Sequence, residues 1–369
     1  MRGEVTVATE LQKFASQIKP LNHDAMEQAR LRLDSFVKPP GSLGKLEDIA
    51  VTLAGISGQL YYDASKRCVI TMSSDNGVVE EGVSLAPQFF THMLMLSFAE
   101  GLAGVSVLTK QFGADLIIVD VGVNADINHP LVKNKKIRKS TWNIAKQDAM
   151  TRDEAERAVL IGIETAVEAV NNGYALLGAG EMGIGNTTTS SAVLCALTGI
   201  SAEQSAGKGA GLTEEAYRRK IEVIQTALRN NKPDLHDPID VLAKVGGFDI
   251  AALAGLYIGG AVMRVPVVID GFISMVAALA AARINPAAKD FMIASHKSFE
   301  QGFAHASNAL GIEPCLHLNM RLGEGSGCPI MFAVIDAACA VMRDMGTFEQ
   351  ANLGYEYLDK AREGDNFSV

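Results

Sequence analysis

The chain has 369 residues, of which 48% are hydrophobic and 20% charged, and its formal net charge is −9. This length and apolar content support one large domain or two modest ones, and they exclude a disordered chain. The acidic balance argues against a general nucleic-acid binder, which needs a basic face. The five cysteines include no CxxC pair and their number is odd, so we expect reduced thiols in the cytoplasm rather than disulfides or a thiolate metal site.

The N-terminal part of the chain, residues 22–58, predicts two helices. The first must end at the Lys-Pro-Pro-Gly segment 38–41, because proline and glycine do not continue a helix. The second begins after Ser42. Both have apolar residues at helical spacing, which form the expected buried faces: Ala25, Ala29, Leu33 and Phe36, then Leu46, Ile49, Leu53 and Ile56.

From Cys68 onward, short apolar runs end in acidic or glycine-rich loops and are followed by longer helical patterns. The runs are CVITM at 68–72, DLIIVDVG at 115–122, YALLGAG at 174–180 and VPVVID at 265–270. Continuous apolar runs of this length suit strands buried on both faces. Their alternation with helices predicts an α/β fold with a largely parallel sheet.

The most apolar stretch, 250–282, is interrupted by Arg264, Pro266 and Asp270. It therefore lacks the ~18–20 uninterrupted apolar residues that span a bilayer, and we expect a buried helix, strand and helix instead. The N-terminal sequence MRGEVTVATELQKF also lacks the apolar segment of a secretory signal. These two observations predict a protein without a membrane partner.

No internal repeat or low-complexity linker divides the chain. We expect a large α/β domain over residues 66–345 and a smaller helical domain built from the chain ends. Residues 1–65 would supply its N-terminal part, and the polar tail 346–369 would join it.

Acidic residues stand at or just beyond the ends of apolar runs, near glycine: Asp75, Asp120, Glu181, Asp270 and Glu324. In an open parallel sheet, ligands bind outside the carboxyl ends of the strands. The alternative is that individual acids cap the following helices. Five caps are the less favoured interpretation, so we predict that these acids converge on one crevice.

The segment Gly178–Gly183 fits the pattern GxGxxG after a strand, which raises a second candidate function, an NAD-dependent oxidoreductase. Two features disfavour it. The following helix is expected to begin after Gly185-Asn186-Thr187-Thr188, beyond the third glycine, and the carboxylate of Glu181 inside the loop would repel a pyrophosphate. The start Asn186-Thr187-Thr188 instead suits a helix N-terminus that binds one phosphate.

Two further glycine segments carry candidate site residues. Gly207-Lys208-Gly209-Ala210-Gly211 precedes a helix with Lys220, and it lacks the Ser or Thr that the Walker pattern requires after GK. Lys220 can still serve a phosphate as a point charge, the alternative being a solvated lysine on an amphipathic helix. In MRLGEGSG at 320–327, glycines on both sides let Glu324 approach a ligand closely, the alternative being a surface turn.

At these residues the sequence resembles the family of nicotinate-nucleotide:dimethylbenzimidazole phosphoribosyltransferases, which activate the lower-ligand base of cobamides. The resemblance implies a Rossmann-like sheet, a small helical domain from the termini, and a dimer with sites near the subunit interface, either a homodimer or a heterodimer with a paralogous subunit. The motifs that carry it are KPPGSLGKLE at 38–47, EGVSLAP at 81–87, VDVGVNAD at 119–126, GAGEMGIGNTT at 178–188, KVGGFD at 244–249, IDGFIS at 269–274 and MRLGEGSG at 320–327.

The resemblance implies transfer of phosphoribosyl from nicotinate mononucleotide to an aromatic base, without a cofactor or a metal. The ring nitrogen of nicotinate is cationic in the glycosidic bond, so nicotinate leaves neutral and needs no general acid. A β substrate and an α product mean inversion by direct displacement, for which one general base suffices. The family pattern implies that Glu324 is this base and that Glu181 lies near the ribose, where it can balance positive charge.

The remaining nucleotide contacts are carried over from the family motif by motif. Among them, Lys220 and Ser298 suit contacts to the phosphate. The implied nucleotide-binding residues are Gly183, Asn186, Thr187, Gly209, Lys220, Asp270 and Ser298.

The chain departs from the family pattern in three places. Asn76 replaces a common histidine, and the segment 139–143 replaces Arg-Gly-x-x-Asn. The third departure concerns the base: Ala86 and Leu94 stand where the family has polar side chains. With Gln88 and Leu322 they form the predicted base contacts, and Phe89, Phe90 and Met93 are apolar neighbours.

An apolar base pocket changes the expected substrate. The second ring nitrogen of a benzimidazole costs ~1–3 kcal/mol if buried without a partner. Phenol and p-cresol, which some relatives attach through an O-glycosidic bond, have no such atom. The alternative is that Gln88, a backbone group or a water satisfies the nitrogen, so both dimethylbenzimidazole and a phenolic base stay open.

Overall fold

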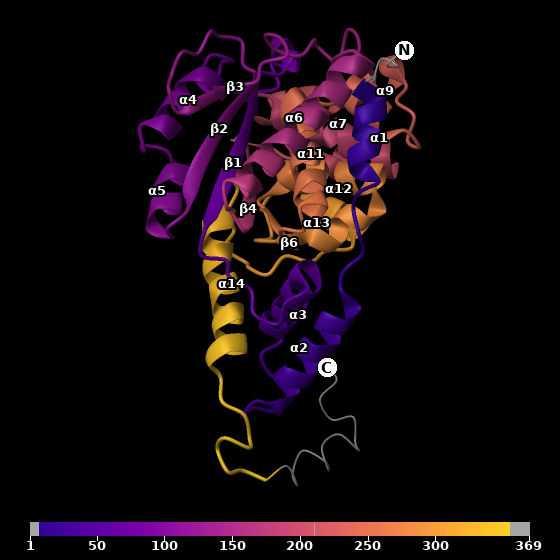
Figure 1. The fold of residues 1–369 in the computed structure, drawn as a ribbon. Coiled ribbons are helices and arrows are strands. Elements are labelled where there is room, and N and C mark those ends of the chain that lie inside the picture. Colours follow the sequence, from indigo (N-terminus) through magenta and orange to yellow (C-terminus); the bar gives the residue numbers. More distant parts are fainter. Residues whose placement is uncertain (1–6, 210, 355–369) are drawn as a thin grey trace, which may run out of the picture. The chain divides into compact units, whose positions relative to one another are not determined.

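The computed structural model describes residues 7–209 and 211–354, whose contacts form two compact units (Figure 1). The large unit holds residues 7–19 and Lys66–Met331, and the small unit holds Pro20–Ser65 and residues 332–354. This grouping differs from the expected domain boundaries for residues 7–19 and 332–345. The remainder of the predicted domains, residues 1–6 and 355–369, lies outside the described residues.

The large unit is built on a parallel six-stranded sheet in the order β3-β2-β1-β4-β5-β6, which confirms the predicted α/β class. Four strands match the predicted apolar runs: β1 (Arg67–Ser74), β2 (Asp115–Gly122), β4 (Leu176–Met182) and β5 (Val267–Ile269). The strands β3 (Val132–Asn134) and β6 (Met292–Ala294) were not predicted.

The strand order reverses between β1 and β4, which lie side by side in the middle of the sheet. Their register pairs Met72 with Glu181 and Ser73 with Met182, so both strands end at the same level. Residues Cys68–Ser74 and the whole of β4 are buried, as expected for central parallel strands. A reversal of strand order opens a crevice at the carboxyl ends of the strands, where ligands of such sheets bind.

Helices lie on both sides of the sheet in Figure 1, with α4 (Phe90–Ala99) and α5 (Gly104–Gln111) on one side and α6 (Arg152–Asn171) and α11 (Phe248–Val262) on the other. The predicted helix, strand and helix over 250–282 are α11, β5 and α12, which confirms that expectation. The other helices of the large unit are α1 (Val7–Ala15), η1 (Gly77–Glu81), α7 (Asn186–Thr198), α8 (Ala202–Ser205), α9 (Glu214–Asn231), α10 (Pro238–Val245), α12 (Phe272–Ile284), η2 (Pro286–Phe291) and α13 (Phe303–Leu310).

The helices α6 and α11 touch through their backbones. A Cβ atom at Gly162 would lie 1.9 Å from the carbonyl oxygen of Ala252, and one at Gly255 would lie 1.8 Å from that of Val159. Any side chain at these two glycines would push the helices apart. This crossing fixes the position of α11 along its own axis relative to the sheet. The first turn of α11 lies near the carboxyl ends of the strands.

The small unit contains the two predicted N-terminal helices, α2 (His23–Ser35) and α3 (Lys45–Ser57), together with the part of α14 (Gly327–Asp344) from residue 332 onward. Between α2 and α3, the buried Lys38 Nζ lies 2.9 Å from Oε1 of Glu47. The same oxygen accepts the backbone N–H of Leu43 at 2.9 Å. The predicted break at 38–41 is therefore an ordered loop.

One helical stretch among the described residues, Phe90–Gln111, is long and apolar enough to cross a membrane by length and composition alone. It consists of α4 and α5 with a break between them. Core helices of globular proteins meet the same criterion, so a single stretch is weak evidence for a membrane span. The five cysteines are free thiols.

Candidate active site

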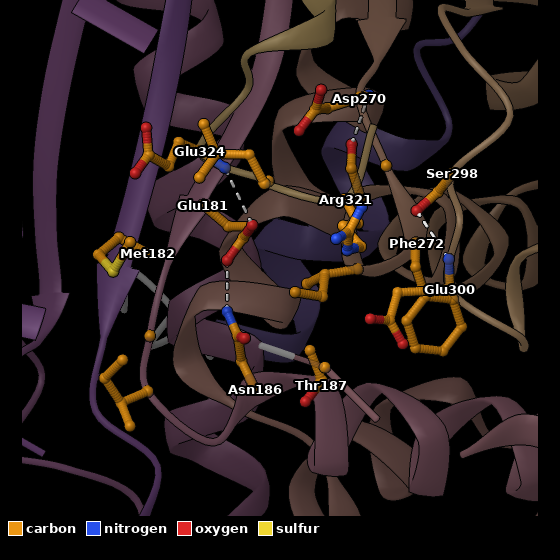
Figure 2. Close-up of a pocket in the computed structure, with 18 of the residues that line it drawn as sticks. Glu181, Met182, Asn186, Thr187, Asp270, Phe272, Ser298, Glu300, Arg321 and Glu324 are labelled. Atoms are coloured by element: carbon orange, nitrogen blue, oxygen red, sulfur yellow. Dashed lines mark hydrogen bonds between the residues drawn. The ribbon is translucent and has the colours of Figure 1, made fainter. Parts of the chain in front are cut away.

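A cavity of about 810 Å³ lies at the carboxyl ends of β4, β5 and β6 (Figure 2). Glu181, Asp270 and Glu324 line it, as predicted for acids near the ends of strands. Asp75 and Asp120 do not line it, so the expected convergence of all five acids is wrong for these two.

The two excluded carboxylates bond to groups outside the cavity lining. Asp75 accepts the hydroxyl of Thr91 at 2.7 Å and the N–H of Asn124 at 2.8 Å. Asp120 lies 3.1 Å from Nζ of Lys136 and accepts the N–H groups of the loop that follows β2. Neither acid caps the following helix, so the capping alternative is also wrong for these two.

Glu324 has a left-handed backbone with φ of 65°, between Gly323 at 82° and Gly325 at 90°. This conformation turns its carboxyl group toward the start of α5, where the N–H of Val105 donates to Oε2 at 3.2 Å. Burial raises the pKa of Glu324, and the Val105 N–H lowers it in part. A buried carboxylate with a raised pKa is well suited to accept a proton near neutral pH.

Glu181 is the next-to-last residue of β4, so it belongs to the strand and not to the loop in which we expected it. Figure 2 shows its carboxyl group between Asn186 and the backbone of Glu324. Asn186 Nδ2 donates to Oε2, and the N–H of Glu324 donates to Oε1 at 3.3 Å. Burial raises the pKa of Glu181 to about 8, and the charges of Asp249 and Asp270 act in the same direction.

Asp270 follows β5 and holds the loop that carries Glu324. Its Oδ2 accepts the N–H of Gly325 at 3.0 Å, and its Oδ1 accepts that of Gly327 at 2.7 Å. Burial raises the pKa of Asp270 to about 7. Asp270, a predicted nucleotide-binding residue, thus lines the cavity while both of its carboxyl oxygens bond to the segment that carries Glu324.

The other end of the cavity is suited to an anion. Gly185 precedes α7 with φ of 93° and has no side chain to cap the helix, so the helix start is open to a ligand. The predicted contacts Gly183, Asn186, Thr187, Gly209 and Ser298 all line the cavity.

Lys220 of α9 reaches this end through Thr187. It is fully buried, and its Nζ donates to Oγ1 of Thr187 at 2.9 Å and to the carbonyl of Gly207 at 3.0 Å. Burial lowers the pKa of Lys220 to about 8, while the charge of Glu300 raises it. The alternative of a solvated lysine is therefore wrong.

Of the predicted base contacts, Ala86, Leu94 and Leu322 line the cavity together with Leu85 and Phe90. Gln88 is not part of this lining. Its amide group accepts from Asn124 Nδ2 at 2.9 Å and donates to the hydroxyl of Ser140 at 3.3 Å. The role of Gln88 at the base stays a prediction.

Sequence reasoning missed several polar residues at or behind the cavity. His296 and Glu300 line it, although only Ser298 was chosen from the same segment. Burial lowers the pKa of His296 to about 4, so this ring is neutral near pH 7. Arg321 also lines the cavity, and Asp249 lies behind it. Arg321 belongs to the motif MRLGEGSG and Asp249 to KVGGFD, so these motifs were the sequence signal that could have identified both residues.

Within residues 7–209 and 211–354, no group of three or more His, Cys, Asp or Glu side chains has a geometry that could hold a metal ion. The acids of the cavity instead bond to backbone N–H groups and to Asn186.

Comparison with known proteins identifies the family. The family model described as "Phosphoribosyltransferase" matches residues 18–353. A nicotinate-nucleotide–dimethylbenzimidazole phosphoribosyltransferase of Clostridium perfringens is 49% identical over 359 residues, covering 97% of this chain and 99% of the relative. The chain belongs to this phosphoribosyltransferase family.

Other members support the assignment. The phosphoribosyltransferase of the same name from Ruminiclostridium cellulolyticum is 51% identical over 92% of this chain and 96% of its own length. A crystal structure of CobT from Thermus thermophilus superposes with a TM-score of 0.86 at 39% identity, covering 90% of this chain and 99% of that one. The parallel sheet and the flanking helices are therefore the fold of this enzyme family.

Proposed function

We propose that this phosphoribosyltransferase moves the phosphoribosyl group of nicotinate mononucleotide to an aromatic lower-ligand base, giving nicotinate and an α-ribotide for cobamide biosynthesis. One observation carries the proposal: a single cavity joins the open start of α7, where Lys220 lies behind Thr187, to a buried Glu324 beside apolar side chains. A phosphate at the first end and an aromatic base at the second would place the sugar carbon between Glu181 and Glu324.

In this reaction Glu324 accepts the proton of the incoming base as the new bond to C1′ of the ribose forms. The bond from C1′ to the nicotinate nitrogen breaks on the opposite face, and its electron pair neutralises the pyridinium ring. No acid is needed for the leaving group, and the configuration at C1′ inverts. Ionised Glu181 would balance the positive charge that spreads over the sugar in the transition state.

We propose that the natural base is dimethylbenzimidazole or a phenolic compound such as phenol or p-cresol. Ala86 and Leu94 line the cavity and offer no hydrogen bond from a side chain. A phenol hydroxyl has a pKa near ~10, as in tyrosine, so it is mostly un-ionised at neutral pH. Glu324 would have to take its proton during attack.

The base preference is tested by the ratio of kcat/KM for p-cresol to that for dimethylbenzimidazole, in the wild type and in the Ala86→Ser, Leu94→Gln double variant. We expect the wild type to form the phenolic ribotide and the double variant to shift toward dimethylbenzimidazole, whose second nitrogen then has a partner. A wild type that makes no phenolic ribotide overturns the phenolic proposal. An unchanged ratio removes the two residues from base selection.

The reaction itself is tested by incubating the protein with nicotinate mononucleotide and a mixture of benzimidazoles, purines and phenols, and identifying the ribotide by mass spectrometry. No ribotide with any base would contradict the proposed function. Calorimetric binding of NAD but not of nicotinate mononucleotide would favour the oxidoreductase alternative.

We further infer a cytoplasmic dimer, formed by two copies or with a paralogous subunit. Large apolar side chains are exposed on and near α4 and α5: Leu85, Phe89, Met93, Leu102 and Val107. Such a patch is more common at protein interfaces than on a monomer surface. The mass of the purified protein in solution by light scattering tests this, and a monomer that retains activity would contradict it.

A further inference from the structure

Asp249 is a fully buried carboxylate that the reaction described above does not use. It stands in the first turn of α11, shortly after Gly246 and Gly247, in the motif KVGGFD. It does not line the cavity, yet its Oδ2 accepts a hydrogen bond from Asn186 Nδ2 at 3.1 Å. Asn186 does line the cavity.

The same amide nitrogen of Asn186 also donates to Oε2 of Glu181. An amide nitrogen carries two hydrogens, so each carboxylate takes one of them. Asn186 therefore cannot rotate toward Glu181 alone without abandoning Asp249. The other oxygen of Glu181 accepts the N–H of Glu324, which completes a chain of bonds from Asp249 to the catalytic loop.

Asp249 has little freedom to move. A Cβ atom at Gly183 would lie 2.5 Å from its Oδ2, and one at Gly247 would lie 2.3 Å from its Oδ1. Its Oδ1 also accepts the N–H of Ile250 at 3.0 Å, within the first turn of α11. The glycine backbones on both sides thus clamp a carboxylate whose position is set by the sheet and by α11.

We propose that Asp249 is a positioning residue, which through Asn186 holds the carboxyl group of Glu181 in the orientation needed beside the sugar. This inference rests on the proposed function, because Glu181 acts there on the ribose.

The charge of Asp249 has a second effect on Glu181. The ionisable groups around the two are Asp270, after β5, and Glu324, before α14, and both are acidic. The other neighbours, Asn76 and the α7 residues Asn186 and Thr189, are neutral. Burial raises the pKa of Asp249 to about 7, and its charge contributes to the raised pKa of Glu181. Loss of this charge would let Glu181 ionise at lower pH.

Two variants distinguish the effect of the hydrogen bond between Asp249 and Asn186 from the effect of the Asp249 charge. Asp249→Asn keeps an oxygen that can accept from Asn186, whereas Asp249→Ala removes both. We expect Asp249→Ala to lower kcat about tenfold or more while the KM for nicotinate mononucleotide changes less than about threefold, because the phosphate end is untouched. Asp249→Asn should keep kcat within about threefold. Both variants should shift the acidic limb of the kcat/KM profile to lower pH.

Asp120→Asn is the matched control, since Asp120 is a buried aspartate near the end of β2 whose side chain bonds to Gly122, Val123 and Lys136, none of which lines the cavity. Asp120→Asn should not shift the acidic limb of the kcat/KM profile. Unshifted limbs in both Asp249 variants, or a raised KM with unchanged kcat in Asp249→Ala, would overturn the proposal. If Asp249→Ala folds poorly, the nearly isosteric Asp249→Leu, which also offers Asn186 no acceptor, takes its place in the same measurements.

A crystal structure of the Asp249→Ala variant gives a readout that does not depend on activity. We expect the side chains of Asn186 and Glu181 to leave their wild-type positions. If they stay, Asp249 has no positioning role, whatever the activity. If the wild type forms no ribotide, the proposed function fails, and this structure still decides whether Asp249 orients Glu181.

Discussion

Glu324 combines two features that rarely coincide by chance. A left-handed backbone at a residue other than glycine costs ~1–2 kcal/mol, and such strain gathers at functional sites. Here the strained residue is also a buried carboxylate whose Oε2 faces the N–H of Val105. The conformation turns the carboxyl group into the cavity, where the incoming base would lie.

Replacing Glu324 by Gln should abolish most turnover and leave nucleotide binding nearly intact. The amide fills the same space but cannot accept the proton, and loss of a general base typically costs ~10²–10⁴-fold in rate. Turnover and calorimetric binding of nicotinate mononucleotide measure the two effects. Glu215→Gln, on the exposed start of α9, is the control. Turnover of Glu324→Gln within a few-fold of the wild type would exclude Glu324 as the base.

Lys220→Ala should weaken the binding of nicotinate mononucleotide and leave that of the free aromatic base unchanged. The buried ammonium group lies at Thr187, at the open start of α7. A charged hydrogen bond to phosphate is worth ~1.5–3 kcal/mol, which corresponds to a ~10–100-fold loss of affinity. Titration calorimetry with both ligands tests this. Equal losses for the two ligands would contradict a phosphate contact.

Glu300→Gln should have the opposite effect on the same ligand. Its Oε2 is buried and has no hydrogen-bond partner among the described residues, and its charge acts on Lys220. The negative charge of this carboxylate would repel a phosphate bound near Lys220. Neutralising Glu300 should therefore increase the affinity for nicotinate mononucleotide several-fold. Weaker binding would show that Glu300 accepts a hydrogen bond from the substrate.

At the scale of elements, the crossing of α6 and α11 decides where the first turn of α11 lies. Gly255→Ala would place a methyl group against the backbone of Val159, and the helices would have to separate. We expect destabilisation by at least ~1–3 kcal/mol, as for overpacked cores. Gly346→Ala is a suitable control, because the nearest atom would lie 3.6 Å from the new Cβ. Urea unfolding measures both, and equal stability of the two variants would refute the close crossing.

For the whole molecule, the buried acids should make the substrate-free protein less stable as the pH rises. The unfolded chain releases the protons of Asp and Glu near ~4, whereas folded Glu181 keeps its proton to about 8 and Asp249 and Asp270 keep theirs to about 7. Between pH 6.5 and 8 the unfolded state therefore binds fewer protons, and stability falls with pH.

Thermal melting across pH 6.5–8 tests this expectation. This pH range lies above the titration of His296, whose pKa of about 4 in the folded protein makes stability rise with pH between ~4 and ~6.5. It ends at about pH 8, above which the lowered pKa of Lys220 would also make stability rise with pH. The melting temperature should fall with pH in the wild type and fall less in Asp249→Asn. A flat wild-type curve would mean that these acids ionise freely in the folded protein.

Several features were available from the sequence alone. Long apolar runs predicted β1, β2, β4 and β5, because strands buried on both faces need them. Unusual glycine segments singled out Glu181 and Glu324 and pointed to the family, since a glutamate beside glycine can approach a ligand closely. The start of α7 after Gly185 followed from its Asn-Thr-Thr sequence.

The tertiary structure decided which polar groups meet. Asp270 holds the Glu324 loop, Asp249 reaches Glu181 through Asn186, and Lys220 is buried behind Thr187. Sequence patterns report periodicity and local backbone preference, which act over a few residues. These contacts instead join loops after different strands, and they exist because the order β1-β4-β5-β6 brings the carboxyl ends of those strands side by side. Asp75 and Asp120 show the same limit, because the hydrogen bonds of Asp75 to Thr91 and Asn124 join segments far apart in the sequence and were not visible in it.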